Sequence, residues 1–342
     1  IDMLREKFEK IIKNKILNIL YLNDEYDIYL VSSARSAIFC FFNSIKNKKS
    51  VVLIPNYVCN VIYKAIEETG VSQIVLYDVT DNLLPNLQDL KNKNDIFRPD
   101  IILFAPIFGA YSKEFINIMK ITSEFSNRPK IFLDFAQDFD APIPKFVDIG
   151  VSTFNKKTIN GFFGGILIIK KKDYSISTIN LEHNSIKDEL QYLKLLISMF
   201  ISSIIDKRNK NNFSFNDNYD YSYCKYFPYT INNFSISIVS ILYNLLALSK
   251  FYSHRKIRTK NFYYINQALN NIEDMKIIIH ERTKFSPFIP IIIKNKKALK
   301  KLKIFADKNK ILIKNPYSKP NNKDESFKNY LFALENPFKK LF

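Results

Sequence analysis

The sequence predicts an α/β fold, in which a large domain is built on a mostly parallel central sheet and a smaller α/β domain follows at the C-terminal end. Two observations support this fold class. Up to residue 170, short runs of Val, Ile, Leu and aromatic residues alternate with helix-like stretches, as in sheets whose parallel strands are joined by helices. Beyond residue 172 the pattern changes to long helices and then to a strand, strand, helix, strand series. The two domains are expected to comprise residues 1–240 and 241–342.

The elements of the large domain can be assigned from the spacing of apolar residues. Leu4, Phe8, Ile12 and Ile16 recur at helical spacing, which predicts an amphipathic helix over residues 2–20. Strands are expected at 28–31, 51–54, 73–77, 101–105, 130–134, 151–154 and 165–169, with helices at 34–43, 58–68 and 114–124.

The C-terminal half is predicted to be richer in helix. One helix is expected at 187–206, and a second, at 235–269, forms the hinge to the small domain. The stretch between them, 207–233, is polar and rich in Asn and Tyr, and a loop of this length in a compact domain is usually functional or mobile. The remaining expected elements are strands at 276–280, 288–293 and 311–313 and a helix at 296–308.

Composition and charge narrow the class of protein. With 342 residues, 47% of them apolar, and only six glycines, the chain is expected to form a packed globular body. The formal charge of +18 is compatible with a polyanion partner. Lysines are abundant along the whole chain, so general lysine enrichment is favoured over a nucleic-acid site, although a positive field would help to recruit an anionic substrate.

Several classes of site are excluded or disfavoured. No glycine-lysine phosphate loop and no G-x-G-x-x-G pattern occurs. The cysteines and histidines are widely spaced, which predicts neither disulfides nor a metal site: Cys40, Cys59, Cys224, His183, His254 and His280. Residues 1–15 do not resemble a secretory signal, and the longest apolar stretch, 195–205, is shorter than the roughly 20 residues that a membrane span needs. A cytoplasmic protein without a membrane span is therefore expected.

Two strand ends carry the most informative side chains. The apolar run from Ile131 ends in Asp134, and the next strand ends near Ser152 and is followed by Lys157. Both groups should lie at the carboxyl edge of a parallel sheet, where α/β proteins bind ligands. Pyridoxal phosphate (PLP) enzymes need this pair, because a lysine forms the Schiff base and an acid keeps the pyridine nitrogen protonated.

These motifs resemble those of the DegT-like sugar aminotransferases, which belong to the fold-type-I PLP enzymes of the aspartate aminotransferase superfamily. The resemblance covers residues 30 to 170 well and the C-terminal third in outline. It is carried by the order and spacing of six segments: Ser33-Ala-Arg-Ser-Ala-Ile38, Val52-Leu-Ile-Pro-Asn-Tyr-Val-Cys59, Phe104-Ala-Pro-Ile-Phe-Gly109, Asp134-Phe-Ala-Gln137, Asp148 to Lys157, and Gly164-Gly165.

The resemblance implies a PLP site and a role for each matching residue. Lys157 would form the Schiff base; counts from Ser152 and from the double glycine both select it over Lys156. Asp134 would pair with the pyridinium nitrogen, and Gln137 would lie near the phenolic oxygen of the ring.

The phosphate and the face of the ring would have their own contacts. Ser152 and the backbone of Arg35 and Ser36 would hold the phosphate at a helix start. Cys59 or Tyr57 occupies the position from which the family stacks a side chain on the ring. The sequence also departs from the family pattern, with Ala34 in the phosphate turn, Thr153 after the serine and a short interval between Asp134 and Lys157, and this leaves open a divergent or an inactive member.

The family's activity is the transfer of an amino group. The resemblance implies an aminotransferase for a keto sugar, in particular a nucleotide-linked one, with a donor such as glutamate, in surface polysaccharide or glycan biosynthesis. It also implies a homodimer in which Asn232 or Asn233 reaches the partner's site. The alternatives are a PLP-dependent lyase or decarboxylase, for which Arg255, Arg258 or Arg282 could bind a substrate carboxylate, and a non-catalytic polyanion binder.

Overall fold

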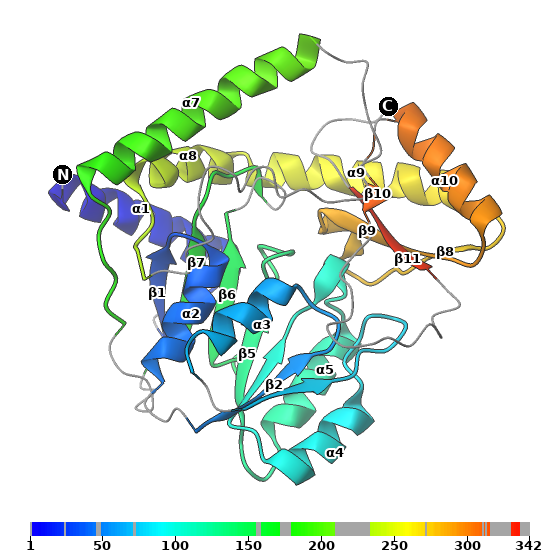
Figure 1. The fold of residues 1–342 in the computed structure, drawn as a ribbon, viewed down its shortest axis with the longest axis horizontal. Coiled ribbons are helices and arrows are strands. Elements are labelled where there is room, and N and C mark those ends of the chain that lie inside the picture. The colour runs from blue at the N-terminus through cyan, green and yellow to red at the C-terminus, as the bar shows by residue number, and fades with distance from the viewer. Residues whose placement is uncertain are drawn as a thin grey trace.

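The structure, a computed structural model, describes residues 2–23, 25–45, 49–70, 73–154, 159–171, 179–208, 233–270, 272–309, 311, 313–314 and 330–335 (Figure 1). Lys156, Lys157, Cys224 and Asn232 lie outside these residues.

A seven-stranded sheet forms the centre of the large domain, in the order β1-β7-β6-β5-β4-β2-β3. Neighbours from β3 to β6 run parallel, whereas β7 is antiparallel to both β6 and β1. The prediction of a mostly parallel sheet is thus confirmed, and each expected strand of this domain is present within two residues of its predicted bounds. The strands are β1 (Tyr26–Val31), β2 (Val51–Pro55), β3 (Gln73–Tyr77), β4 (Ile101–Phe104), β5 (Lys130–Asp134), β6 (Ile149–Thr153) and β7 (Gly165–Lys170).

Helices cover both faces of this sheet because its central strands are apolar on both sides. Phe132 points into the core beneath α2 (Ala34–Ser44) and α3 (Asn60–Glu67). Its neighbours Ile131 and Leu133 point into the opposite core. The helices of that second core are α1 (Asp2–Leu20), α4 (Leu87–Phe97), α5 (Lys113–Ser123) and α8 (Ile238–Ser249).

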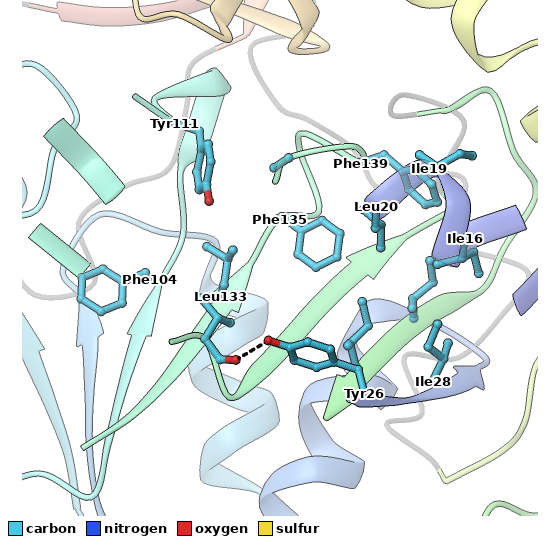
Figure 2. Packing of buried hydrophobic residues seen from close by; sticks show 14 of the residues in the cluster. Ile16, Ile19, Leu20, Tyr26, Ile28, Phe104, Tyr111, Leu133, Phe135 and Phe139 are labelled. Atoms are coloured by element: carbon cyan, nitrogen blue, oxygen red, sulfur yellow. Dashed lines mark hydrogen bonds between the residues drawn. The ribbon is translucent and has the colours of Figure 1, made fainter. Parts of the chain in front are cut away.

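Aromatic side chains fill much of this second core (Figure 2). Phe135 and Phe139, which follow β5, pack near Leu20 and Ile19 at the end of α1. The Tyr26 hydroxyl donates a hydrogen bond to the Val147 carbonyl at 3.1 Å, so this buried phenol has a partner. The segment between β5 and β6 is therefore held at both of its ends, by this packing after β5 and by the Tyr26 hydrogen bond before β6.

The C-terminal part has its own sheet, in the order β10-β11-β9-β8. Its strands are β8 (Met275–Ile277), β9 (Phe288–Ile293), β10 (Ile313–Lys314) and β11 (Tyr330–Glu335), and α9 (Phe251–Leu269) and α10 (Lys296–Asn309) pack on it. This confirms a smaller α/β unit at the C-terminal end. The sequence does not predict β11, which pairs along the whole length of β9.

Two helical predictions need correction. The expected helix at 235–269 is two helices, α8 and α9, which are interrupted at Lys250 (φ −98°, ψ 3°). The amide of Lys250 bonds back to Ala247 and Leu248, which closes the last turn of α8, and no Gly or Pro marks the break. The second correction is the addition of α4, a polar helix with only Leu90 and Asn94 buried.

The position of α8 bears on the domain boundary. Ile241 and Leu248 of α8, and Phe251 at the start of α9, belong to the core of the large sheet. The division at residue 240 stays a prediction.

Among the described helices, including α7 (Ile186–Arg208), none is both long and apolar enough to cross a bilayer.

Candidate active site at the carboxyl edge of the sheet

Asp134 stands at the end of β5, at the carboxyl edge of the parallel strands. Its carboxylate accepts a hydrogen bond from the Ala136 amide at 2.9 Å. Burial raises the pKa of this carboxyl to about 6, and the Ala136 hydrogen bond opposes part of that rise. A cationic partner at this position would offset the unfavourable desolvation of the charged form.

The start of α2 lies at the same edge and presents several hydroxyl groups. Ser33 caps the helix, and its hydroxyl accepts a hydrogen bond from the Ser36 amide at 3.1 Å. The Ser36 hydroxyl lies 2.8 Å from that of Ser32 and 3.0 Å from that of Ser33. With the half-buried Arg35 and the positive end of the helix dipole, this turn can bind an anion.

The double glycine brings the start of β7 against this turn. The Gly164 amide donates to the Ser32 carbonyl at 3.0 Å. A Cβ atom on Gly165 would lie 2.4 Å from the Ser33 carbonyl carbon and 2.5 Å from the Ala34 nitrogen. Only a residue without a side chain permits this approach, which explains the second glycine in physical terms.

Cys59 lies at the same edge of the sheet as the two charged groups Asp134 and Arg35. It precedes α3, and its thiol responds to the charges of both Asp134 and Arg35. Burial is the main cause that raises the pKa of this thiol, and a hydrogen bond with the Val61 backbone lowers it; the smaller effects are those of the Asp134 charge, which raises it, and the Arg35 charge, which lowers it. The structure therefore places three residues that the sequence assigns to one site at the same edge of the sheet.

Gln137 is held by a turn that follows the adjacent strand β4. Its Oε1 accepts a hydrogen bond from the Phe108 amide at 2.7 Å. Phe108 has a left-handed backbone (φ 54°, ψ 28°), and the following Gly109 (φ 74°) lies against the backbone of Arg282 and Thr283. The amide of Gln137 is thus oriented by a turn that the C-terminal part contacts.

Two other predicted site residues have different surroundings. The Ser152 side chain is fully buried, and its hydroxyl donates to the Phe135 carbonyl at 3.4 Å. Tyr57 packs on the cluster of Leu83, Ile107, Phe108, Ala110, Ile278 and Phe288, and burial raises the pKa of its phenol. Of the two candidates for the face of the ring, the Asp134 charge raises the pKa of Cys59, whereas burial alone raises that of Tyr57.

Directly after Gln137 lies a network of charges that the sequence does not predict. Arg282 forms two hydrogen bonds with Asp138, one of them at 2.8 Å, and a third with Asp140 at 2.7 Å. Arg255 pairs with Asp140 and lies 3.6 Å from the centre of the Phe285 ring. From the sequence, Arg255 and Arg282 are candidate ligands for a substrate carboxylate, whereas the structure pairs both with carboxylates of the chain.

A water-sized cavity of about 10 Å³ lies among these groups, lined in part by Gln137 and Arg258. The described residues contain no group of three or more His, Cys, Asp or Glu side chains that could hold a metal ion. The described groups at this edge are a half-buried acid, a helix start that can bind an anion and an oriented amide.

Comparisons with known proteins agree with this architecture. No protein-family model matches the sequence, and no curated protein matches it significantly. Solved structures do match over nearly the whole chain. Helicobacter pylori PseC, an aminotransferase involved in the biosynthesis of pseudoaminic acid, aligns with 96% of this chain and 85% of its own at 12% identity and a TM-score of 0.62.

Two further structures extend the comparison. A DegT DnrJ EryC1 StrS aminotransferase from Brucella abortus aligns with 96% of this chain and 84% of its own at 14% identity and a TM-score of 0.60. A NifS-like protein from Rickettsia africae aligns with 98% and 84% at 16% identity and a TM-score of 0.61. The chain thus has the fold of the PLP-dependent aminotransferases, as the resemblance of its motifs implied.

Proposed function

We propose that the protein is a PLP-dependent aminotransferase that acts on a sugar. The observation that carries this proposal is the carboxyl of Asp134, whose pKa burial raises to about 6, at the same carboxyl edge of the sheet as Cys59 and the start of α2 with Arg35. In this fold, that edge is the place where a ligand can meet strand ends and a helix start together.

The described residues fit PLP in the chemistry of their donors. The Asp134 carboxylate would pair with the protonated pyridine nitrogen, which offsets the cost of its burial. The start of α2, with Ser32, Ser33 and Arg35, would hold the phosphate. The Ser36 amide already has the Ser33 hydroxyl as its acceptor, so a phosphate there would have to share or replace that bond.

When bound, PLP supplies an electron sink for chemistry at the carbon that bears the amino group. Lys157, which lies outside the described residues, would attach the cofactor and move the proton between substrate and cofactor. Gln137 would contact the ring from an orientation fixed by the Phe108 amide. Cys59 would cover one face of the ring.

The substrate class is a further part of the proposal. A keto sugar, nucleotide-linked, would take an amino group from a donor such as glutamate, in the biosynthesis of a surface polysaccharide or glycan. PseC and the Brucella aminotransferase support this choice, since both share the fold and the first is involved in the biosynthesis of pseudoaminic acid. The net charge of +18 would favour an anionic nucleotide sugar.

A second copy of the chain would complete the site in a homodimer, with Asn232 of one subunit near the cofactor of the other.

The NifS-like structure, which is similar to this chain to the same extent, keeps a different PLP reaction open as the alternative. A substrate screen separates these reactions. Of the reactions compared, only that of an aminotransferase converts the aminated form of the cofactor back to PLP when a keto sugar is added.

The cofactor is tested by absorption and by labelling. The purified protein is incubated with PLP, reduced with borohydride and digested, and the modified peptide is sequenced. We expect a pyridoxyl group on Lys157; Lys157→Ala should abolish the label and the matched variant Lys156→Ala should retain it. Absence of PLP uptake by the wild-type protein would sink the proposal, and salt-sensitive binding of polyanions alone would favour the non-catalytic alternative.

A further inference from the structure

Arg5, near the start of α1, is buried where α1, α7 and α8 meet, with 3% of the residue exposed (Figure 1). One nitrogen of its guanidinium, Nη1, donates to the Ser235 hydroxyl at 2.9 Å and to the Ile236 carbonyl at 3.0 Å. The other, Nη2, forms an ion pair with Glu189 of α7 at 3.1 Å. A buried cation is costly unless it is paired and hydrogen-bonded, so these bonds hold the guanidinium and its partners in one arrangement.

The segment of residues 234–236, which Arg5 contacts, lies beside the end of β1, from which the chain enters the turn at the start of α2. The Ile236 amide donates to the Leu30 carbonyl at 3.1 Å. The Ser32 amide donates to the carbonyl of residue 234 at 3.0 Å. Backbone bonds thus run from this segment directly to Ser32, the first serine of the turn.

The side chain of Ile236 confines the turn from a second direction. It is fully buried, and a Cβ atom on Gly164 would lie 2.5 Å from its Cδ1. The Gly164 amide in turn donates to the Ser32 carbonyl at 3.0 Å. Ser32 is therefore held through both its amide and its carbonyl, and its hydroxyl lies 2.8 Å from that of Ser36.

We infer that Arg5 is a positioning residue for the turn at residues 32–36: by holding residues 234–236 against α1 and α7, it fixes the place of Ser32 and of the Ser36 hydroxyl beside it. This inference rests on the proposed function, in which this turn holds the phosphate of PLP. The bonds of Arg5 go to the segment and to α7, so an effect of this residue on phosphate binding has to pass through residues 234–236.

The partners of Glu189 make Arg5 replaceable in an experiment. The Glu189 carboxylate also accepts hydrogen bonds from the amides of Ile238 at 3.0 Å and Val239 at 3.4 Å, at the start of α8. In Arg5→Met this carboxylate therefore keeps two donors and the positive end of a helix, and a flexible apolar side chain can fill much of the same space. The fold should survive, while residues 234–236 lose their hydrogen bonds to α1.

The test compares the affinity for PLP with that for pyridoxal, which lacks the phosphate. Both compounds can form a Schiff base, so the ratio of their dissociation constants isolates the contribution of the phosphate. Absorption titrations give this ratio for the wild-type protein, Arg5→Met and Arg5→Lys. The lysine keeps a charge beside Glu189 but lacks the planar fork of the guanidinium, so it should replace only part of the bonds. Ser240→Ala is the matched control, because Ser240 is also buried and bonds to Ser237 at the start of α8.

In Arg5→Met we expect the preference for PLP over pyridoxal to fall roughly tenfold, as for the loss of about one charge-assisted hydrogen bond to the phosphate. In Arg5→Lys it should fall by less. In the cofactor-free proteins, hydrogen exchange at the Ser32 amide should become faster in Arg5→Met. Ser240→Ala should leave both the preference and this exchange unchanged, whatever its melting temperature.

The outcomes separate the two levels of inference. A wild-type preference for PLP in both Arg5 variants, with only the melting temperature lowered, would show that Arg5 merely supports the fold and would overturn the inference. If Arg5→Met does not fold, the preference of Arg5→Lys decides in the same way.

The wild-type protein provides the remaining outcomes. Equal affinities for PLP and pyridoxal would show that the turn does not hold the phosphate, which overturns the inference and leaves a PLP site in place. If the wild-type protein binds neither compound, the proposed function itself fails and the positioning role fails with it.

Discussion

At the scale of single residues, the folded environment of Asp134 disfavours the charged form of its carboxyl. The folded carboxyl holds its proton up to a pH of about 6 because burial raises its pKa, whereas an unfolded aspartate releases it near pH ~4. Between about pH 4 and pH 6 the folded state binds more protons, so the stability contributed by this group falls as the pH rises, and it stays lowered above pH 6.

Asp134→Asn should therefore stabilise the PLP-free protein at pH 8. Two pKa units correspond to about 3 kcal/mol, and partial exposure reduces the expected gain to about 1–2 kcal/mol. The asparagine can still accept the bond from the Ala136 amide. Urea unfolding at pH 8 measures this gain in the free energy of unfolding. At pH 4 the gain should largely vanish, because the folded wild-type aspartic acid and the asparagine of the variant are both neutral. The same substitution should weaken retention of PLP, and a variant that is no more stable at pH 8 than the wild-type protein would contradict this account.

Sequence reasoning at this scale succeeded where the chemistry is local and failed where the partner is distant. The places of Asp134, Gln137 and the glycine pair at strand ends could be predicted from short spacings, and their roles toward a cofactor stay predictions. The partners of Gln137 and Asp138, which are Phe108 and Arg282, come from other parts of the chain. No local pattern distinguishes an arginine that binds a substrate from one that pairs with an internal carboxylate.

At the scale of elements, the contact between the start of β7 and the start of α2 depends on Gly165. Gly165→Ala would place Cβ against backbone atoms of Ser33 and Ala34, which cannot rotate away. We expect a loss of about 1–3 kcal/mol in the free energy of unfolding. Because the displaced backbone is the turn that we propose holds the phosphate, the affinity for PLP should fall too.

Gly70→Ala is the matched control for this prediction. Gly70 has a left-handed backbone (φ +73°), and no heavy atom of the described residues, its immediate chain neighbours aside, lies within 4 Å of the place that a Cβ atom would take. Its substitution therefore brings backbone strain of about 1 kcal/mol without a clash at the site. Unfolding in urea and PLP titration are measured for both. Equal PLP affinities in the two variants would show that the close approach at Gly165 does not shape the turn.

The elements themselves could mostly be predicted from apolar periodicity, because the buried strands are continuous apolar runs. The exceptions have physical reasons. The polar helix α4 buries only Leu90 and Asn94, so it has almost no apolar stripe. The break at Lys250 is a single residue with non-helical ψ inside a long apolar pattern, and propensity gives no signal for it. Strand β11 is stabilised by its pairing with β9, which is distant in the sequence.

At the scale of the whole molecule, the two sheets are joined by the charges around Phe285. Asp138 and Asp140 follow β5 of the large sheet, Arg255 lies on α9, and Arg282 precedes the turn that leads into β9. The side chain of Asp138 is 1% exposed and that of Arg282 is 13% exposed. This network therefore resembles an internal ion pair and not a surface one.

Arg282→Ala should destabilise the protein by about 3 kcal/mol, since removal of one member of a buried pair leaves an uncompensated charge. The double variant Arg282→Ala with Asp138→Asn should recover part of that loss, because the amide is less costly to bury than an unpaired carboxylate. Lys93→Ala, which removes an i, i+4 pair with Asp89 on the surface of α4, should cost less than about 0.5 kcal/mol.

Unfolding in urea, followed by both far-UV circular dichroism and tyrosine fluorescence, tests the coupling as well as the stability. If the network joins the sheets, the C-terminal sheet should lose its coupling to the large one in Arg282→Ala, and the two signals should cease to coincide. The double variant should bring them closer together. Coincident transitions in all three proteins, with a loss in Arg282→Ala no larger than that of Lys93→Ala, would mean that the apolar contact of Phe108 with Phe288, at 6.2 Å between ring centres, suffices to hold the two sheets together.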